Sequence, residues 1–241
     1  MRIGFSLALT QPRGSGGAPP PPPPPNAVVK GWTDAAYFDA GAAGPVFGPG
    51  KSIAVALRRE APAGASDVLW GVQTAGGTPG WSLWTDGTWK VSRNGFPIDT
   101  LVSSEDAPGT LVTLAITWVA ADGSLRFSRN GAAVGSVAGS AVYAPPDGTS
   151  VHDLGRWVTA GFPADAFAVA ALSAWDGELS DAQLQAVHGT GYDTLHPAGA
   201  PTRLLHWHAG RDWDGAAPTS TSGGSSPVTY TVVGAPTREV I

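Results

Sequence analysis

Residues 169–188, VAALSAWDGELSDAQLQAVH, decide the fold of this chain, because they join a strand to the one convincing helix signal in an otherwise β-patterned sequence. Every second residue from Val169 to Ser173 is expected on one face of a β-strand that ends at Trp175. Asp176-Gly177 then predicts a turn, since these residues accept the backbone conformations that tight turns require. The stretch therefore predicts a strand that turns directly into a helix.

The helix signal consists of a start, an apolar face and a stop. Ser180 stands three residues before Gln183, a capping box that satisfies free backbone N–H groups where a helix begins. Leu184 and Val187 follow on one face, and Gly189 predicts the end of the helix. We therefore expect one short helix in a protein made mostly of strands.

The composition favours a single β-rich domain with short appendages. Hydrophobic residues make up 42% of the 241 residues, enough for a core, while charged residues make up 14%. Glycine (33) and proline (22) are abundant, which is typical of short strands joined by tight turns and argues against a helical protein. The length suits one large β-sandwich.

The same composition excludes several partners and site types. The formal net charge is −5 and no basic run is present, so nucleic-acid binding is not expected. The absence of cysteine excludes disulfides, thiolate catalysis and zinc–thiolate sites. No apolar run approaches the roughly 20 residues of a membrane-spanning helix, so membrane insertion is not expected.

Further strand signals follow one another along the chain, each bounded by Gly, Pro or Asp-Gly. They cover residues 52–58, 68–72, 81–84, 88–92, 111–119, 125–129 and 132–134. Asn130-Gly131 predicts a tight hairpin, because both turn positions need a positive φ. Asn94-Gly95 repeats this pattern in a similar local sequence.

Residues 1–13 are interpreted as an anchoring peptide. Ile3, Phe5, Leu7 and Leu9 alternate with smaller residues, which fits a β-strand that docks on another subunit. A secretory signal is the alternative, although the stretch lacks a small-x-small cleavage site.

Residues 14–26 are expected to separate this peptide from the rest of the chain. A Gly/Ser hinge is followed by seven prolines, Pro19 to Pro25, which favour a polyproline II rod of roughly 20 Å. The globular head then occupies residues 27–241.

Two stretches of the head resemble a known family. Residues 111–136, LVTLAITWVAADGSLRFSRNGAAVGS, are similar to the core pattern of laminin-G-like domains. Residues 169–188 resemble the closing segment of laminin-G-like and pentraxin-like domains of the concanavalin A-like lectin/glucanase superfamily. The likeness extends over about residues 34–236 and implies an all-β fold, an antiparallel jelly-roll sandwich.

The ten tryptophans divide into core candidates and binding candidates. Three lie within strand alternations and are expected in the core: Trp70, Trp118 and Trp175. Trp84 and Trp89 flank the turn at Asp86, and Trp213 lies in a polar loop. We expect these three rings, with Asp86, to form exposed platforms for a sugar.

No catalytic arrangement is evident. The glutamates Glu60, Glu105, Glu178 and Glu239 are scattered, and none stands two residues from another acid on a strand. Glycoside hydrolases need two carboxylates across the scissile bond, so hydrolysis is not expected. A Gly-x-Ser-x-Gly nucleophile motif is also missing.

Two metal-site signals are weak. His206 and His208 fall on one strand face, where two imidazoles can chelate a metal, but ordinary strand histidines are the simpler interpretation. The family resemblance implies calcium held by loop oxygens, and Asp212 and Asp214 are the candidate ligands.

Together these features favour a non-enzymatic display protein of a phage or phage-like particle: a tail fibre, spike or capsid decoration protein. Its head is expected to bind a host-surface glycan and its N-terminal peptide to contact other particle subunits. We expect a homo-oligomer on the surface of a virion or extracellular particle. The alternatives are a structural subunit without a ligand, and a secreted lectin module or hydrolase.

Overall fold

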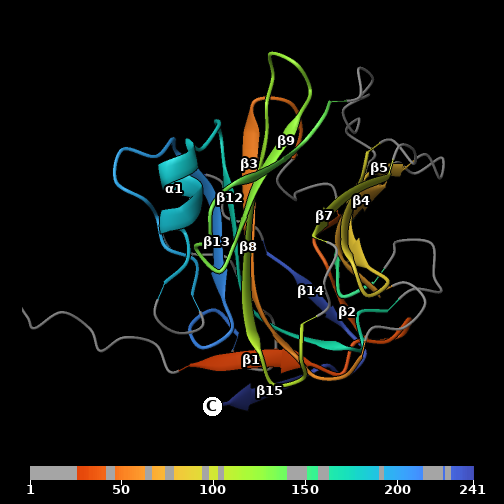
Figure 1. Ribbon diagram of the computed structural model, residues 1–241. Coiled ribbons are helices and arrows are strands. Elements are labelled where there is room, and N and C mark those ends of the chain that lie inside the picture. The colour runs from red at the N-terminus through yellow and green to blue at the C-terminus, as the bar shows by residue number, and fades with distance from the viewer. Residues whose placement is uncertain are drawn as a thin grey trace, which may run out of the picture.

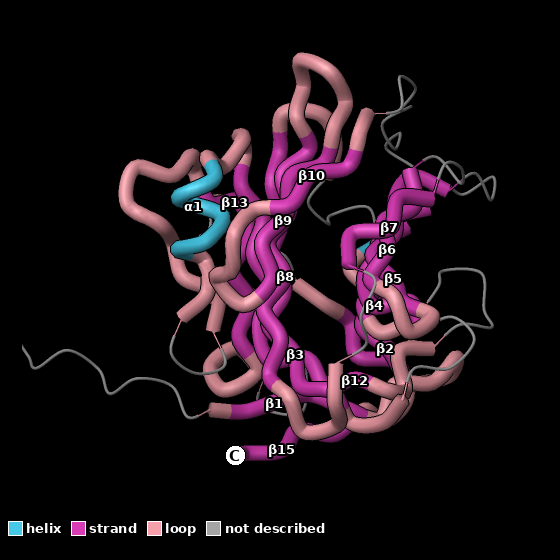
Figure 2. The backbone as a smooth tube through the Cα atoms, viewed as in Figure 1, coloured by secondary structure: helices cyan, strands magenta, loops and turns pink. Residues whose placement is uncertain are grey.

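The computed structural model shows two antiparallel sheets packed face to face, with one short helix (Figures 1 and 2). The structure describes residues 26–41, 47–62, 67–73, 79–93, 98–102, 106–139, 151–156, 163–189, 193–213, 225 and 229–241. This architecture confirms the predicted β-sandwich. The described helix is too short to cross a membrane.

The first sheet has eight strands in the order β10-β9-β8-β3-β12-β1-β15, with β13 also paired to β12. Their bounds are β1 (Ala27–Lys30), β3 (Lys51–Arg59), β8 (Leu111–Trp118), β9 (Leu125–Arg129), β10 (Gly135–Val137), β12 (Phe167–Trp175), β13 (Arg203–His208) and β15 (Thr237–Val240).

The second sheet has seven strands in the order β14-β2-β11-β4-β5-β6-β7. Their bounds are β2 (Tyr37–Asp39), β4 (Asp67–Gln73), β5 (Pro79–Thr85), β6 (Trp89–Arg93), β7 (Ile98–Val102), β11 (Val151–Leu154) and β14 (Thr231–Val233).

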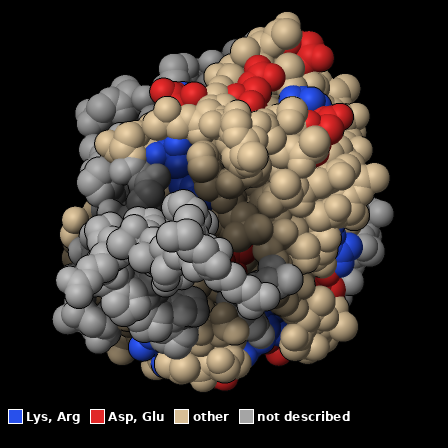
Figure 3. All heavy atoms as spheres, turned by 90° about the vertical axis from the view of Figure 1, so that its left-hand side faces the viewer, with Lys and Arg blue, Asp and Glu red and all other residues tan. Residues whose placement is uncertain are grey.

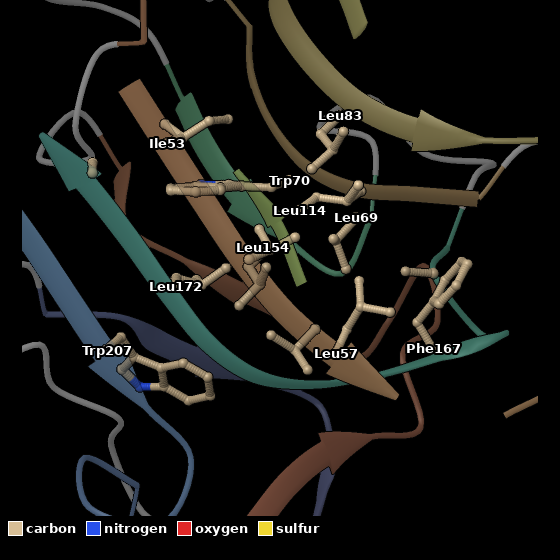
Figure 4. Packing of buried hydrophobic residues seen from close by; sticks show 14 of the residues in the cluster. Ile53, Leu57, Leu69, Trp70, Leu83, Leu114, Leu154, Phe167, Leu172 and Trp207 are labelled. Carbon is tan, nitrogen blue, oxygen red and sulfur yellow. The ribbon is translucent and has the colours of Figure 1, made fainter. Parts of the chain in front are cut away.

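The main core lies between the two sheets, because alternate residues of each strand point inward. Figure 4 shows Ile53 and Leu57 of β3 facing Trp70 and Leu83 of the second sheet. Each aliphatic side chain buried in this way stabilises the fold by about 1.5–3 kcal/mol. The predicted core tryptophans Trp70 and Trp118 belong to this cluster.

The strand predicted from Val169 is β12, but its alternation breaks at a bulge. The register against β3 shifts between Val169 and Ala171. As a result Val169 joins the core between the sheets, while Ala171 packs in a separate cluster on the outer side. The prediction that Val169 shares a face with Ala171 and Ser173 is therefore wrong, because a bulge adds one residue to the pleat.

The predicted helix is α1 (Asp181–Ala186), and its capping box is confirmed. The Ser180 hydroxyl accepts from the Gln183 N–H at 3.3 Å, and the Gln183 side chain accepts from the Ser180 N–H at 2.9 Å. Leu184 and Val187 are buried. The helix lies on the outer face of the eight-stranded sheet (Figure 1).

The expected role of Gly189 as the helix stop is wrong. The C-cap residue is Val187, in a right-handed conformation, and Gly189 is not among the glycines with a positive φ. A Cβ added at Gly189 would lie 2.9 Å from Leu195 Cγ. This glycine therefore allows close packing of the following loop instead of reversing the backbone.

The Asn130-Gly131 hairpin turn is confirmed. Both residues have positive φ, 53° and 68°, and the Asn130 side chain accepts from the Thr113 N–H at 2.7 Å. The returning strand, β10, begins at Gly135, three residues later than predicted. The similar Asn94-Gly95 pair lies outside the described residues.

Candidate functional site

Two of the three predicted sugar platforms, Trp84 and Trp89, lie on the β5–β6 hairpin of the second sheet. Thr85 pairs with Trp89 across the β5–β6 hairpin, and Trp84 pairs with Lys90, so Trp84 and Trp89 face opposite ways. Trp89 is 2% exposed and belongs to the core, where its indole N–H donates to Asp106 at 3.0 Å. Trp89 is therefore not an exposed platform.

Trp213 is also buried, at 4% exposure, with its ring 5.6 Å from that of Phe38. The prediction that Trp213 is an exposed platform is therefore also wrong, because its ring is packed in the core. The polar residues around Trp213 in the sequence concealed this burial.

Trp84 and Asp86 do come together on the outer face of the seven-stranded sheet. Trp84 is half-buried; its indole N–H donates to the Ser92 hydroxyl at 2.8 Å, and Lys90 Nζ lies 4.9 Å from its ring centroid. Lys90 also forms an ion pair with Asp86. The hydrogen bond from Lys90 is the main reason why the pKa of Asp86 lies below its usual value.

A row of small polar residues crosses this same face. The registers of five adjacent strands place them side by side, and the row consists of Asp39, Asp153, Gly71, Ser82 and Ser92. Asp153, Gly71, Ser82 and Ser92 are buried and form a floor of low side chains, while Asp39 is half-buried. A glycine in mid-strand lets another group approach the backbone closely.

Two half-buried aromatic rings stand on the same side of this row. Trp84 lies two residues beyond Ser82 on β5, and Tyr37 lies two residues before Asp39 on β2. Each strand from β2 through β11 and β4 to β5 is antiparallel to the next, so β2 and β5 run in opposite directions. A step forward on β5 and a step backward on β2 therefore lead to the same side of the row. Each ring carries a cation: Lys90 on Trp84, and Arg156 with its Cζ 3.2 Å from the Tyr37 ring centroid.

Asp153 is the most unusual group of this face. Its Oδ2 accepts from Arg156 Nε at 3.0 Å, while its Oδ1 is buried without a hydrogen-bond partner. Burial raises the pKa of Asp153 to about 6 against the opposing effect of Arg156, and the Asp39 carboxylate, directly opposite on β2, adds to the rise. Burial, with a smaller contribution from Asp39, thus holds the pKa of Asp153 well above its usual value.

We define the polar-row face as Tyr37, Asp39, Gly71, Ser82, Trp84, Asp86, Lys90, Ser92, Asp153 and Arg156. The sequence identified only Trp84 and Asp86 of this set. The β5–β6 alternation alone would have separated Trp84 from Trp89. No local pattern indicates Asp153, since it meets Asp39 through pairing of strands more than 110 positions apart.

The predicted metal ligands do not form a cation site. Asp212 accepts from Arg211 through both oxygens, at 2.7 and 2.6 Å, and from the His208 N–H at 2.8 Å. A calcium ion would have to displace that guanidinium, so Asp212 as placed does not fit a calcium ligand. Asp214 lies outside the described residues.

The two strand histidines are engaged by other groups. His206 Nε2 lies 2.8 Å from Asp193 Oδ1, and His208 Nδ1 accepts from the Gly210 N–H at 3.0 Å. The described part of the chain contains no group of three or more His, Asp or Glu side chains that could hold a metal ion. The predicted anchoring residues Ile3, Phe5, Leu7 and Leu9 lie outside the described residues.

Three solved structures share this fold. A Bacteroides ovatus ATCC 8483 protein, named for an inferred ability to bind carbohydrate, has a TM-score of 0.64 at 12% identity and covers 91% of this chain. The heptameric SAP-like pentraxin of Limulus polyphemus has a TM-score of 0.53 at 12% identity, with 90% of each chain covered. The extracellular region of zebrafish Gpr126/Adgrg6 has a TM-score of 0.60 at 15% identity and covers 90% of this chain.

These likenesses show the fold alone, a sandwich of two antiparallel sheets. The chain spans 61% of the length of the Bacteroides protein and 26% of that of the zebrafish region. No protein-family model and no curated protein sequence matches the chain.

Proposed function

We propose that this protein is a carbohydrate-binding module whose ligand lies on the polar-row face. The single observation that supports this best is the arrangement of the face itself: a floor of small polar residues with two half-buried aromatic rings along one side of it. Sugars combine apolar C–H faces with hydroxyl edges, so they need rings and hydrogen-bonding groups together. The Bacteroides neighbour, named for carbohydrate binding, supports the same proposal.

Each residue has a role in this proposal. The Trp84 indole supplies the stacking surface and is held in orientation by its hydrogen bond to Ser92. Asp39 and Asp86, which retain exposed surface, accept hydrogen bonds from sugar hydroxyls, and Lys90 donates one. The ligand is therefore a neutral hydroxyl-rich sugar, because both acids and bases line its edge.

Binding is tested by glycan-array screening followed by calorimetry with the best glycan. Trp84→Ala is expected to weaken binding by roughly tenfold, the loss of about 1.4 kcal/mol of ring contact. Trp84→Phe retains a ring and is expected to keep most of the affinity. Leu195→Ala, an exposed apolar change elsewhere, is the matched control. Equal affinity in wild type and Trp84→Ala contradicts the proposed location.

The proposed role is binding without hydrolysis. Asp39 and Asp153 face each other across two strands, and Asp153 has the raised pKa expected of a general acid. However, Asp153 is 0% exposed and its Oδ2 is held by Arg156, so a glycosidic oxygen cannot reach it. We expect no release of reducing ends from any polysaccharide that the protein binds; release abolished by Asp153→Asn would contradict this.

We further propose that residues 1–13 attach the head to a phage or phage-like particle, as a homo-oligomer on its surface. The support is the alternating apolar peptide followed by the proline run. Deletion of residues 1–17 is expected to leave the head folded but absent from assembled particles. Normal incorporation of the truncated chain would contradict the anchor, and a wild-type protein that binds no glycan would favour a structural subunit.

A further inference from the structure

A second cluster of polar side chains lies on the opposite sheet, on the outer side where α1 also lies. Trp175, the last residue of β12, pairs with Arg203, the first residue of β13. The loop that contains His196 packs against them, since the Trp175 indole N–H donates to His196 Nδ1 at 3.0 Å. Figure 3 shows this side of the molecule, where the described charged residues form small separate groups among the other residues.

Arg203 is buried, yet among the described residues its guanidinium has no hydrogen-bond or ion-pair partner. The residue is 9% exposed, and its guanidinium carbon lies 5.8 Å from the Trp175 ring centroid. No described residue forms a hydrogen bond or an ion pair with its guanidinium. Burial without a bonded partner lowers the pKa of Arg203, partly opposed by the charge of Asp193. An unpaired buried cation is costly and calls for an explanation.

His196 offers a second unused donor beside this cation. Because its Nδ1 accepts from Trp175, the neutral ring carries its proton on Nε2. Burial, with the charges of Arg203 and His206, lowers the pKa of His196, which favours this neutral form. The His196 residue is exposed, so Nε2–H can reach a ligand from solvent.

The other charged groups nearby are already paired with one another. Asp193 Oδ1 lies 2.8 Å from His206 Nε2 and also accepts from the Thr194 N–H at 2.7 Å. Arg211 and Asp212 form a two-point ion pair, at 2.7 and 2.6 Å. Among the described charged groups of this cluster, Arg203 is therefore the one without an ion pair.

We propose that Arg203 and His196 form a binding site for a carboxylate group on a small ligand such as an acidic sugar. The guanidinium fork matches the two oxygens of a carboxylate, and His196 Nε2–H adds a third donor. One cation beside a neutral imidazole suits a monoanion. A phosphate dianion would be repelled more strongly by Asp193 and would lack a second positive charge.

This site is independent of the polar-row face, because it lies on the other sheet. The ligand of the polar-row face is expected to be neutral, whereas this site requires an anion. Failure of one proposal leaves the other intact.

The test is titration of the ¹⁵N-labelled full-length protein with sodium glucuronate, followed by NMR at the Trp175 indole N–H, which a Trp175→Phe spectrum assigns. Saturable shifts of this signal are expected with glucuronate and with acetate, but not with methyl glucoside. Arg203→Gln is expected to weaken glucuronate binding at least about tenfold, and Arg203→Lys, which keeps the charge without the fork, by about three- to tenfold.

Two further variants separate binding from folding and from net charge. His196→Ala removes the Nε2–H donor and is expected to weaken binding about threefold. It also removes the acceptor of the buried Trp175 indole N–H, so the melting temperature should fall modestly while the protein stays folded. Arg126→Gln removes the same charge from an arginine already paired with Asp181, and is expected to leave binding unchanged. The proposal is overturned if glucuronate does not shift the Trp175 signal, if phosphate binds more tightly than glucuronate, or if His196→Ala and Arg203→Lys both bind like wild type.

Discussion

The outer faces of the two sheets have the same pleated geometry but carry different side chains: one is packed against a helix, and the other presents polar residues. On the eight-stranded sheet, Ala54 and Ala115 are small enough for α1 to lie close, and Leu184 and Trp175 fill the space between. The only α-helix in the described residues lies there. On the seven-stranded sheet, the equivalent outward positions carry serines, a glycine and acids.

One carboxylate on each face shows the difference between the faces in its pKa. Glu239, on the edge strand β15 of the eight-stranded sheet, has its pKa lowered to about 2 by hydrogen bonds from Lys30 and Arg58. Asp153, on the polar-row face, has its pKa raised to about 6 by burial. Glu239 therefore contributes to stability, whereas Asp153 is an acid that destabilises the fold at neutral pH. Groups kept against stability are expected at functional sites.

The largest expected effect tests whether α1 is part of the core. Leu184→Ala should lower the free energy of unfolding by about 2–4 kcal/mol, because it leaves a cavity over Ala54 and Ala115. Urea unfolding followed by tryptophan fluorescence measures this loss. Trp84→Ala, on the other face, should cost less. Equal losses from the two substitutions would remove the contrast between the faces.

Asp153→Asn tests whether the polar-row face lowers the stability of the fold at neutral pH. A carboxyl whose pKa is raised from 3.8 to about 6 in the folded state binds its proton more tightly there. The wild type should therefore lose about 1–3 kcal/mol through this group as pH rises from 4 to 7, with the full penalty above pH 6. Asp153→Asn should flatten that part of the stability curve. A curve of unchanged slope would show that Asp153 is ionised at an ordinary pKa.

Ser180→Ala tests how much the N-cap hydrogen bond contributes to the stability of α1. Losing the cap should lower the free energy of unfolding by about 1 kcal/mol, since the Gln183 N–H loses its acceptor. Ser180→Asp retains an acceptor and should restore most of the loss, as thermal unfolding can show. A fully stable Ser180→Ala variant would mean that packing alone positions α1.

The smallest effect is expected for Glu239→Gln. A lowered carboxyl pKa contributes stability that is present above the unfolded value of 4.5 and lost as pH falls toward 2. The melting temperature of the wild type should therefore fall more steeply between these pH values than that of Glu239→Gln. Lys30→Met should reduce the same acid sensitivity, because it removes one of the two cations. Parallel acid profiles would contradict a role for this ion pair.

Sequence patterns predicted the elements well but the site poorly. The capping box at Ser180 and the positive-φ turn at Asn130 are local, so the residues themselves contain the information. The polar-row face depends on pairing between β2, β11 and β4, which are distant in the chain. Of its members, the sequence identified only Trp84 and Asp86, because Asp86 lies in a recognisable hairpin turn and Trp84 flanks that turn.

The sequence by itself determined that this is an all-β chain with one capped helix, since alternation, turn residues and caps act within a few positions. Only the tertiary structure decided which alternate residues face the core. Trp89 and Trp213 are buried while Trp84 remains half-exposed, because strand parity divides side chains into two sets but does not say which set another sheet will cover. The bulge in β12, the Asp39–Asp153 pair and the burial of Arg203 without an ion-pair partner among the described residues depend on register and packing between distant segments. No local sequence pattern contains that information.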